Sequence, residues 1–312
     1  MAANHVPVLR RNIAPGSSKT KPGPASKPPC LLLRRRFRIP PGVPQNQGEA
    51  MPYSRRSGVD IWYEVTGDGP GLVLIHANPF DHDLWVYQAA HFSTWFRVVS
   101  IDIRGYGRSA KVRTPFTLKD MCDDVIGVMD DLAIGRAVLM GCSVGSGTAI
   151  LLGLDHPERF SSLILVGGNS GSSDRYMKRV EGYRADLSLY HIKHMRELVS
   201  PAFAESRMGH HLLNMFVERE PRLSGEAIAR VFMAGNSTDT TERLPAMKVP
   251  TLVINGEFDH SLKAGQRTAS LIPGAVHKAL PETGHACCIE DPAGFDALVL
   301  EFLRARNLLP EL

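Results

Sequence analysis

A serine flanked by glycines is the first candidate for chemistry in this chain. The stretch from Gly141 to Gly145 (GCSVG) stands between a strand-like run and a helix-like run. Small residues two places before and after a serine let a strand turn sharply into a helix, which exposes the hydroxyl on a strained bend. Ser143 is therefore predicted to be a nucleophile. The next N–H group, on Val144, is expected at a helix N-terminus, where unpaired amides and the helix dipole can stabilise an oxyanion.

A hydroxyl nucleophile needs a base, and the base needs a carboxylate that fixes its tautomer and stabilises its charged form. Candidates for both follow predicted strands. Asp259 comes after the strand-like run at 251–254, and His285 after the run at 276–280. Ligands of open α/β sheets bind beyond the carboxyl ends of the strands. The sequence therefore predicts Ser143, Asp259 and His285 as nucleophile, acid and base.

The elements that must position these side chains alternate between strands and helices. The patterns predict strands at 53–56, 59–65, 72–75, 97–103, 136–142, 162–166, 251–254 and 276–280, and helices at 84–92, 117–132, 144–155, 262–271 and 292–306. Such alternation is typical of an α/β protein with a mostly parallel sheet covered by helices on both faces. From 169 to 247 the alternation stops, and several helices with no convincing strand are expected there. We interpret this stretch as a helical cap inserted into a core of residues 51–168 and 248–312.

The first 50 residues differ in composition from the rest. They contain nine prolines, and residues 1–48 carry nine Lys or Arg but no Asp or Glu. This composition predicts a disordered, basic, Pro-rich extension. It also resembles a transit peptide, although the prolines oppose the amphipathic helix of such a peptide. The remaining chain has 27 basic and 32 acidic residues, so no nucleic-acid partner is expected for the folded body.

Cysteine usage and hydropathy point to a soluble cytoplasmic protein. The five cysteines are scattered and form no C-x-x-C motif, a pattern that favours a reducing compartment. No apolar run approaches the roughly 18 residues that a membrane span requires, so no membrane partner is expected. Cys287 and Cys288 lack the further ligands of a zinc site and are interpreted as packing residues. The sequence gives no indication of oligomeric state.

A second glycine motif invites a cofactor interpretation. Residues 105–110 (GYGRSA) follow a strand and imitate the dinucleotide-binding pattern G-x-G-x-x-A. The next residues, 111–115, do not begin a helix, which that pattern requires. A tight loop behind the active site is the better interpretation. The P-loop pattern G-x-x-x-x-G-K-[ST] is absent from the sequence, and no cofactor or metal is expected.

Five motifs in order resemble the α/β-hydrolase superfamily over about residues 51–312. They are Gly141–Gly145, His76–Pro79, Asp102–Ser109, Gly256–Asp259, and Gly284–His285 with Glu290–Pro292 after it. The resemblance implies the α/β-hydrolase fold, with the cap inserted after the sixth strand as in 3-oxoadipate enol-lactonases and small carboxylesterases. It also implies an oxyanion hole made of the N–H groups of Asn78 and Val144. Two residues depart from the usual pattern: Ala77 and Ser146 stand where the family commonly has glycine.

The resemblance implies a serine hydrolase that cleaves a small ester or lactone through an acyl-enzyme. Alternatives on the same scaffold are a cofactor-free haloperoxidase or perhydrolase, an acyltransferase, a ligand receptor and a catalytically idle partner-binding module. Asp174 is the alternative acid, because some family members carry the acid after the preceding strand. The histidine His76 is expected to brace the oxyanion loop.

Four polar residues of the predicted cap have less defined expectations. His191 and His194, one helical turn apart, are predicted to lie on a solvated face. Arg184 and Arg196 are candidates for contacting a substrate carboxylate, although a solvated helix face explains both equally well. The substrate itself is not indicated by the sequence.

Overall fold

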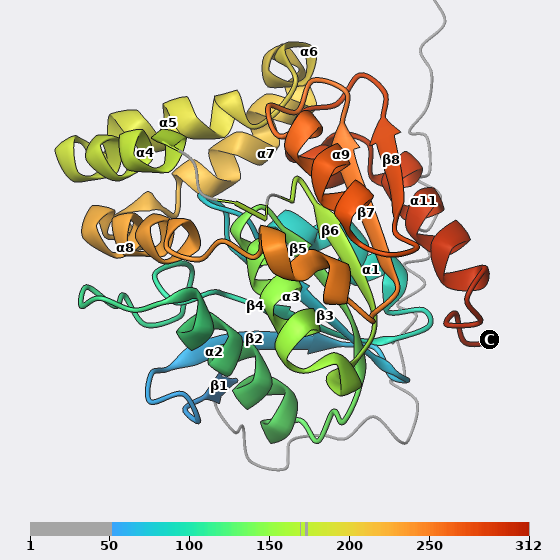
Figure 1. The fold of residues 1–312 in the computed structure, drawn as a ribbon. Helices are drawn as coiled ribbons and strands as arrows, with labels where there is room; N and C mark the ends of the chain where they lie inside the picture. Colours follow the sequence, from blue (N-terminus) through green and yellow to red (C-terminus); the bar gives the residue numbers. More distant parts are fainter. Residues whose placement is uncertain (1–51, 169, 172–173, 312) are drawn as a thin grey trace, which may run out of the picture. The chain divides into compact units, whose positions relative to one another are not determined.

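A computed structural model describes residues 52–168, 170–171 and 174–311. The predicted disordered extension lies outside these residues. The described residues form an eight-stranded sheet in the order β1-β2-β4-β3-β5-β6-β7-β8 (Figure 1). Its strands are β1 Tyr53–Ser54, β2 Ile61–Thr66, β3 Gly71–Ile75, β4 Arg97–Ile101, β5 Ala137–Cys142, β6 Phe160–Val166, β7 Thr251–Gly256 and β8 Val276–Leu280. Strand β2 is antiparallel to both β1 and β4, whereas β4 and all strands beyond it in the sheet run parallel to one another. The predicted mostly parallel sheet is confirmed.

Helices cover both faces of this sheet. The helical elements of the core are η1 His82–Trp85, α1 Val86–Phe92, α2 Leu118–Asp131, α3 Val144–Asp155, η2 Pro157–Arg159, α9 Leu262–Leu271, α10 Cys287–Glu290 and α11 Pro292–Arg304. Residues of β3 alternate between two apolar clusters, because successive side chains of a strand point to opposite faces. Val73 packs in the cluster that holds residues of α2 and α3, and Leu72 packs in the cluster that holds residues of α1 and α11. A capping box made by Thr117 and Asp120 begins α2, as the sequence predicts.

A run of helices separates the sixth strand from the seventh. It comprises α4 Asp174–Ala185, α5 Leu187–Glu197, α6 Pro201–Glu205, α7 Arg207–Val217, η3 Glu220–Arg222, α8 Gly225–Asn236 and η4 Thr241–Ala246. Figure 1 shows α4, α5 and α7 beyond the end of the sheet toward which the arrows of β6 and β7 point. The described residues of this insertion contain no strand, as expected. Its position after the sixth strand also agrees with the prediction.

The turn from β5 into α3 is strained and tightly packed. Ser143 has φ 55° and ψ −112°, a left-handed conformation that a residue with a side chain rarely adopts. A Cβ atom at Gly145 would overlap the carbonyl oxygen of Ile75 on the neighbouring strand, and one at Gly141 would overlap the carbonyl oxygen of Gly145. Small residues at these two places therefore allow the bend, and the predicted strained turn is confirmed.

Replacing Gly145 by alanine should test this packing. We expect Gly145→Ala to lower the free energy of unfolding by about 1–3 kcal/mol, the usual cost of overpacking a tight site, because β3 and α3 must separate. Gly147→Ala is the matched control. It lies two positions further into the body of the same helix, where an added Cβ would meet Leu118 at 3.9 Å. Alanine there should stabilise the protein by about 0.5–1 kcal/mol through helix propensity. Urea unfolding of both variants measures the contrast, and equal effects would contradict it.

Candidate active site

The ring of His285 is held by a buried carboxylate. Its Nδ1 atom lies 2.8 Å from Oδ1 of Asp259, and the side chains are 3% and 0% exposed. The carboxylate also accepts hydrogen bonds from Nδ2 of Asn255 (2.8 Å) and from the N–H of Ser261 (2.7 Å). His285 therefore carries its proton on Nδ1 when neutral, which leaves Nε2 as the acceptor atom.

Asp259 is ionised in this environment. Burial alone would raise its pKa, but the charge of His285 and the hydrogen bonds from His285, Ser261 and Asn255 outweigh burial and lower the pKa well below the ordinary value. A carboxylate that stays charged next to an imidazole stabilises the positive charge that the ring gains on accepting a proton.

Ser143 and His285 line the same small cavity. Its volume is about 190 Å³. The lining residues come from the sheet edge and from the insertion: Asn78, Ser143, Gly167, Tyr176, Arg179, His194, Leu198, Phe232, His260, Ser261, Ala264 and His285. The Nε2 atom of His285 is buried and has no hydrogen-bond partner among the described residues, the Ser143 hydroxyl included. Glycine at 167 makes room for the ring, because a Cβ there would lie 2.5 Å from Cε1 of His285.

The two predicted oxyanion donors belong to different segments of the chain. Val144 is the first residue of α3, so its N–H is among those that no carbonyl of the helix accepts. Asn78 lines the cavity and is only 2% exposed. Both polar atoms of its side-chain amide are buried without a hydrogen-bond partner among the described residues. The roles of both residues remain predictions.

Asp174, the alternative acid, begins α4. His285 instead bonds Asp259, so the geometry favours the first candidate over the alternative.

Comparisons with known proteins identify the family of this fold. A family model described as the alpha/beta hydrolase fold matches residues 70–194. A putative carbamate hydrolase of a Caulobacter species is 31% identical, over 78% of this chain and 95% of that protein. This chain belongs to the α/β-hydrolase family. A 2-hydroxy-6-oxononadienedioate/2-hydroxy-6-oxononatrienedioate hydrolase of Burkholderia vietnamiensis is 29% identical, over 78% of this chain and 91% of that relative. The crystal structure of an enol-lactonase from Burkholderia xenovorans superposes with a TM-score of 0.75 at 27% identity, covering 81% of this chain and all of that one.

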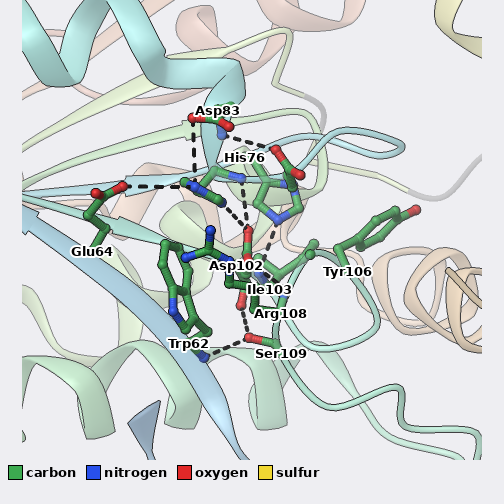
Figure 2. Close-up of polar contacts among 12 residues, drawn as sticks. Trp62, Glu64, His76, Asp83, Asp102, Ile103, Tyr106, Arg108 and Ser109 are labelled. Atoms are coloured by element: carbon green, nitrogen blue, oxygen red, sulfur yellow. Dashed lines mark hydrogen bonds and ion pairs between the residues drawn. The ribbon is translucent and has the colours of Figure 1, made fainter. Parts of the chain in front are cut away.

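Hydrogen bonds of the His76 ring hold the loop of this hydrolase that carries Asn78, as expected. Nδ1 of His76 donates to the carbonyl of Ala77, and its Nε2 accepts from the N–H of Ile103, both at 3.0 Å. Figure 2 shows the ring beside Ile103, with Tyr106 close to it. Burial lowers the pKa of His76, so the ring is neutral and the two bonds use the tautomer with its proton on Nδ1.

A second histidine–aspartate pair anchors the same loop a few residues later. Oδ1 of Asp102 accepts hydrogen bonds from the N–H and from Nδ1 of His82, at 2.9 and 2.8 Å. Oδ2 accepts from the N–H of Arg108 at 2.7 Å (Figure 2). Gly107 is required for this turn, because it has φ 47° and a Cβ there would overlap the carboxylate of Asp102. Residues 105–110 thus form the tight loop that the sequence favoured over a dinucleotide site.

In the part of the chain that the structure describes, two clusters each place three potential metal ligands close together: Asp259, His260 and His285, and Asp81, His82 and Asp102. In each cluster a histidine Nδ1 is already hydrogen-bonded to an aspartate of the same cluster. Asp81 also pairs with Arg219. Because these ligand atoms already bond within the protein, we assign neither cluster as a metal site. Cys287 and Cys288 are fully buried, and burial raises their thiol pKa well above the ordinary value, which fits packing residues.

The prediction of a solvated face for His191 and His194 is wrong. The two residues are 0% and 3% exposed. They lie on the side of α5 that faces the core, where His194 bonds the hydroxyl of Tyr183 (2.8 Å) and lines the Ser143 cavity. Polarity alone misplaced these residues, because a buried hydrogen-bond partner makes an inner position acceptable for a neutral imidazole.

Arg179 is a cap arginine that lines the Ser143 cavity and that sequence reasoning missed. Arg184 and Arg196 instead pair with Glu226 and Glu205 on exposed faces. Arg179 is 8% exposed, pairs with Glu197 at 2.8 Å and lines the cavity with Ser143. The available signal was the helical spacing of the apolar residues 176, 180 and 183, which places position 179 on the inner face of α4.

The His82–Asp102 pair predicts a pH dependence of stability. Burial opposes charge on both groups, but their mutual hydrogen bond and attraction raise the pKa of His82 and lower that of Asp102 to about 2. The raised histidine pKa stabilises the fold below about pH 6.5, and this contribution is lost as the pH rises through the folded value. The lowered aspartate pKa contributes above about pH 4 and is lost as the pH falls toward 2.

We therefore expect the stability deficit of His82→Gln to be largest between about pH 4 and 6.5 and to narrow at higher pH. Urea unfolding of both proteins across this range measures the deficit. His156→Gln is the control, because the side chain of His156 is 40% exposed, and its deficit should stay near zero. A His82→Gln deficit that grows above pH 7 would contradict the assignment of a charged pair.

Proposed function

We propose that this α/β-hydrolase cleaves a small ester or lactone, with Ser143 as nucleophile, His285 as base and Asp259 as the supporting acid. One observation carries the proposal. The Nε2 atom of His285 is buried without a partner among the described residues, in a cavity that Ser143 also lines, while Nδ1 is bonded to Asp259. This is the arrangement that a base needs to accept a hydroxyl proton.

In the proposed reaction His285 takes the Ser143 proton on Nε2 as the hydroxyl oxygen attacks the carbonyl carbon. The N–H groups of Val144 and Asn78 hold the resulting oxyanion, each contributing roughly 3–4 kcal/mol by analogy with measured oxyanion holes. His285 then gives the proton to the leaving alkoxide, which departs as an alcohol. Water, activated by the same ring, attacks the acyl-enzyme and releases the acid.

Replacing the nucleophile tests the assignment. Ser143→Ala should abolish turnover of small chromogenic esters, because no group remains to form the acyl-enzyme. A fluorophosphonate should label the wild type on Ser143 and leave the variant unlabelled. Thermal unfolding checks that the variant is folded. Undiminished turnover by Ser143→Ala would contradict the proposal, and a wild type that binds esters without turnover would favour the ligand-receptor alternative.

The size and polarity of the cavity support a compact, charged substrate. Its volume of about 190 Å³ is below the roughly 300–1,000 Å³ of common small-molecule sites. The buried guanidinium of Arg179 is part of its wall. Burial lowers the pKa of His194 in the same wall, and the positive charge of Arg179 lowers it further. One similar protein is named for a dioate substrate. We propose that the substrate carries a carboxylate that binds Arg179.

Two esters that differ only in charge can test this substrate preference. The aryl half-ester of succinic acid and the neutral aryl ester of similar length share the same leaving group. Arg179→Gln should lower kcat/KM for the half-ester by about 10–100-fold, the equivalent of a hydrogen bond to a charged group, and leave the neutral ester nearly unchanged. Arg184→Gln, which removes an exposed, paired arginine of the same helix, is the control and should alter neither value. Equal losses for both esters would contradict a charge contact.

A further inference from the structure

The loop that carries Asn78 continues into the wall of a second cavity. Asn78 lines the cavity of Ser143, whereas residues 79–83 line a separate cavity of about 390 Å³. The opposite wall of this second cavity comes partly from the insertion and includes His191, Phe216 and Arg219. The segment 79–83 therefore lies where the core of the protein meets the insertion.

Arg219 forms ion pairs with two carboxylates of this segment. Its Nη1 atom lies 2.8 and 2.7 Å from the two carboxylate oxygens of Asp81, and its Nη2 atom lies 2.6 Å from Oδ2 of Asp83. The side chain of Asp81 is only 9% exposed, and that of Arg219 is 31% exposed. A planar guanidinium that bonds two carboxylates fixes their positions more strongly than a single exposed pair does. Arg219 thus holds both ends of the turn at 81–83.

Two further contacts from the insertion reach the same segment. Nε2 of His191 lies 3.3 Å from the carbonyl oxygen of Pro79. The rings of Phe80 and Phe216 meet edge to face, with their centroids 4.8 Å apart. Apolar and polar contacts therefore connect α5 and α7 to the residues that directly follow Asn78.

The core holds the segment from the other side. Asp102 accepts hydrogen bonds from the backbone and the ring of His82, and His76 donates one to the carbonyl of Ala77. The side-chain amide of Asn78 has no partner among the described residues and so does not fix its own backbone. The direction of the Asn78 N–H depends on the contacts that precede and follow it in the chain.

We propose that Arg219 is a positioning residue for the oxyanion site, acting from the insertion through Asp81 and Asp83 on the segment that carries Asn78. The inference rests on the proposed function, because it assumes that the Asn78 N–H holds an oxyanion. Arg219 does not line the Ser143 cavity, so it acts without touching the substrate. Oxyanion donors must lie within about 2.7–3.1 Å of the developing charge, and a displacement of about 1 Å can cost 10²-fold in rate.

Measuring the changes in kcat and in KM separately tests this role. With a neutral aryl ester, Arg219→Gln should lower kcat about 10-fold and change KM less than twofold, since the substrate contacts remain. Asp81→Asn should have the same effect, and the double variant should be no slower than either single one, because the two residues act through one contact. Arg219→Lys should recover part of the rate. Arg196→Gln, which removes an exposed ion pair of the same insertion, is the control and should keep the rate of the wild type.

A tetrahedral inhibitor adds a readout that general loosening of the fold would not imitate. A boronic acid forms an adduct on Ser143 with an oxygen in the oxyanion site, so its Ki should rise about 10-fold in Arg219→Gln while KM stays unchanged. Unchanged kcat and Ki in Arg219→Gln and Asp81→Asn would overturn the positioning role. So would losses that Arg196→Gln shares or that add up in the double variant. If Ser143→Ala abolishes turnover and Arg219→Gln does not alter it, the proposed function stands and only this inference fails.

Discussion

The hydrogen bond between Asp259 and Nδ1 of His285 is the interaction on which the candidate site depends. A buried carboxylate is costly unless hydrogen bonds and an opposite charge compensate for the lost water. Asn255, Ser261 and His285 supply that compensation together, and the bond leaves Nε2 of the ring directed away from the acid. Without this bond the ring would have neither a fixed tautomer nor a fixed orientation, and it could not serve as the proposed base.

The parallel sheet is what brings the partners of this interaction to Ser143. Cys142 at the end of β5 pairs with Val166 on β6, and Val166 pairs with Ile254 on β7. The residues that follow these strands therefore emerge at the same edge, although Ser143 and Asp259 lie far apart in the sequence. Backbones approach so closely at the β5–α3 turn that only glycine fits beside Ile75. The close packing of the backbone at this turn therefore also fixes where Ser143 lies.

The insertion adds the parts of the site that differ most in character from the core. The core supplies the candidate serine, acid and histidine and the proposed oxyanion donors, whereas α4 and α5 supply Arg179 and His194. The ion pairs of Arg219 connect the insertion to the loop behind Asn78. A substrate that engages Arg179 would therefore contact an element that is itself tied to the proposed oxyanion site. Under these proposals, recognition and chemistry are linked through the loop at 78–83.

Local spacing in the sequence determined the sheet, the order of its helices, the strained turn at Ser143 and the identity of the candidate acid and base, because strand periodicity and turn chemistry act over only a few residues. Packing between distant segments decided which polar residues of the insertion face inward. The polarity of His191 and His194 predicts a solvated position for both, yet both are buried because α5 lies against the core. Arg179 and Arg184 stand on one helix and are the same residue type. The side of α4 on which each lies decides whether it lines the Ser143 cavity, as Arg179 does, or forms an exposed ion pair, as Arg184 does. A side chain's exposure depends on what packs against it, and that neighbour is set by the tertiary fold.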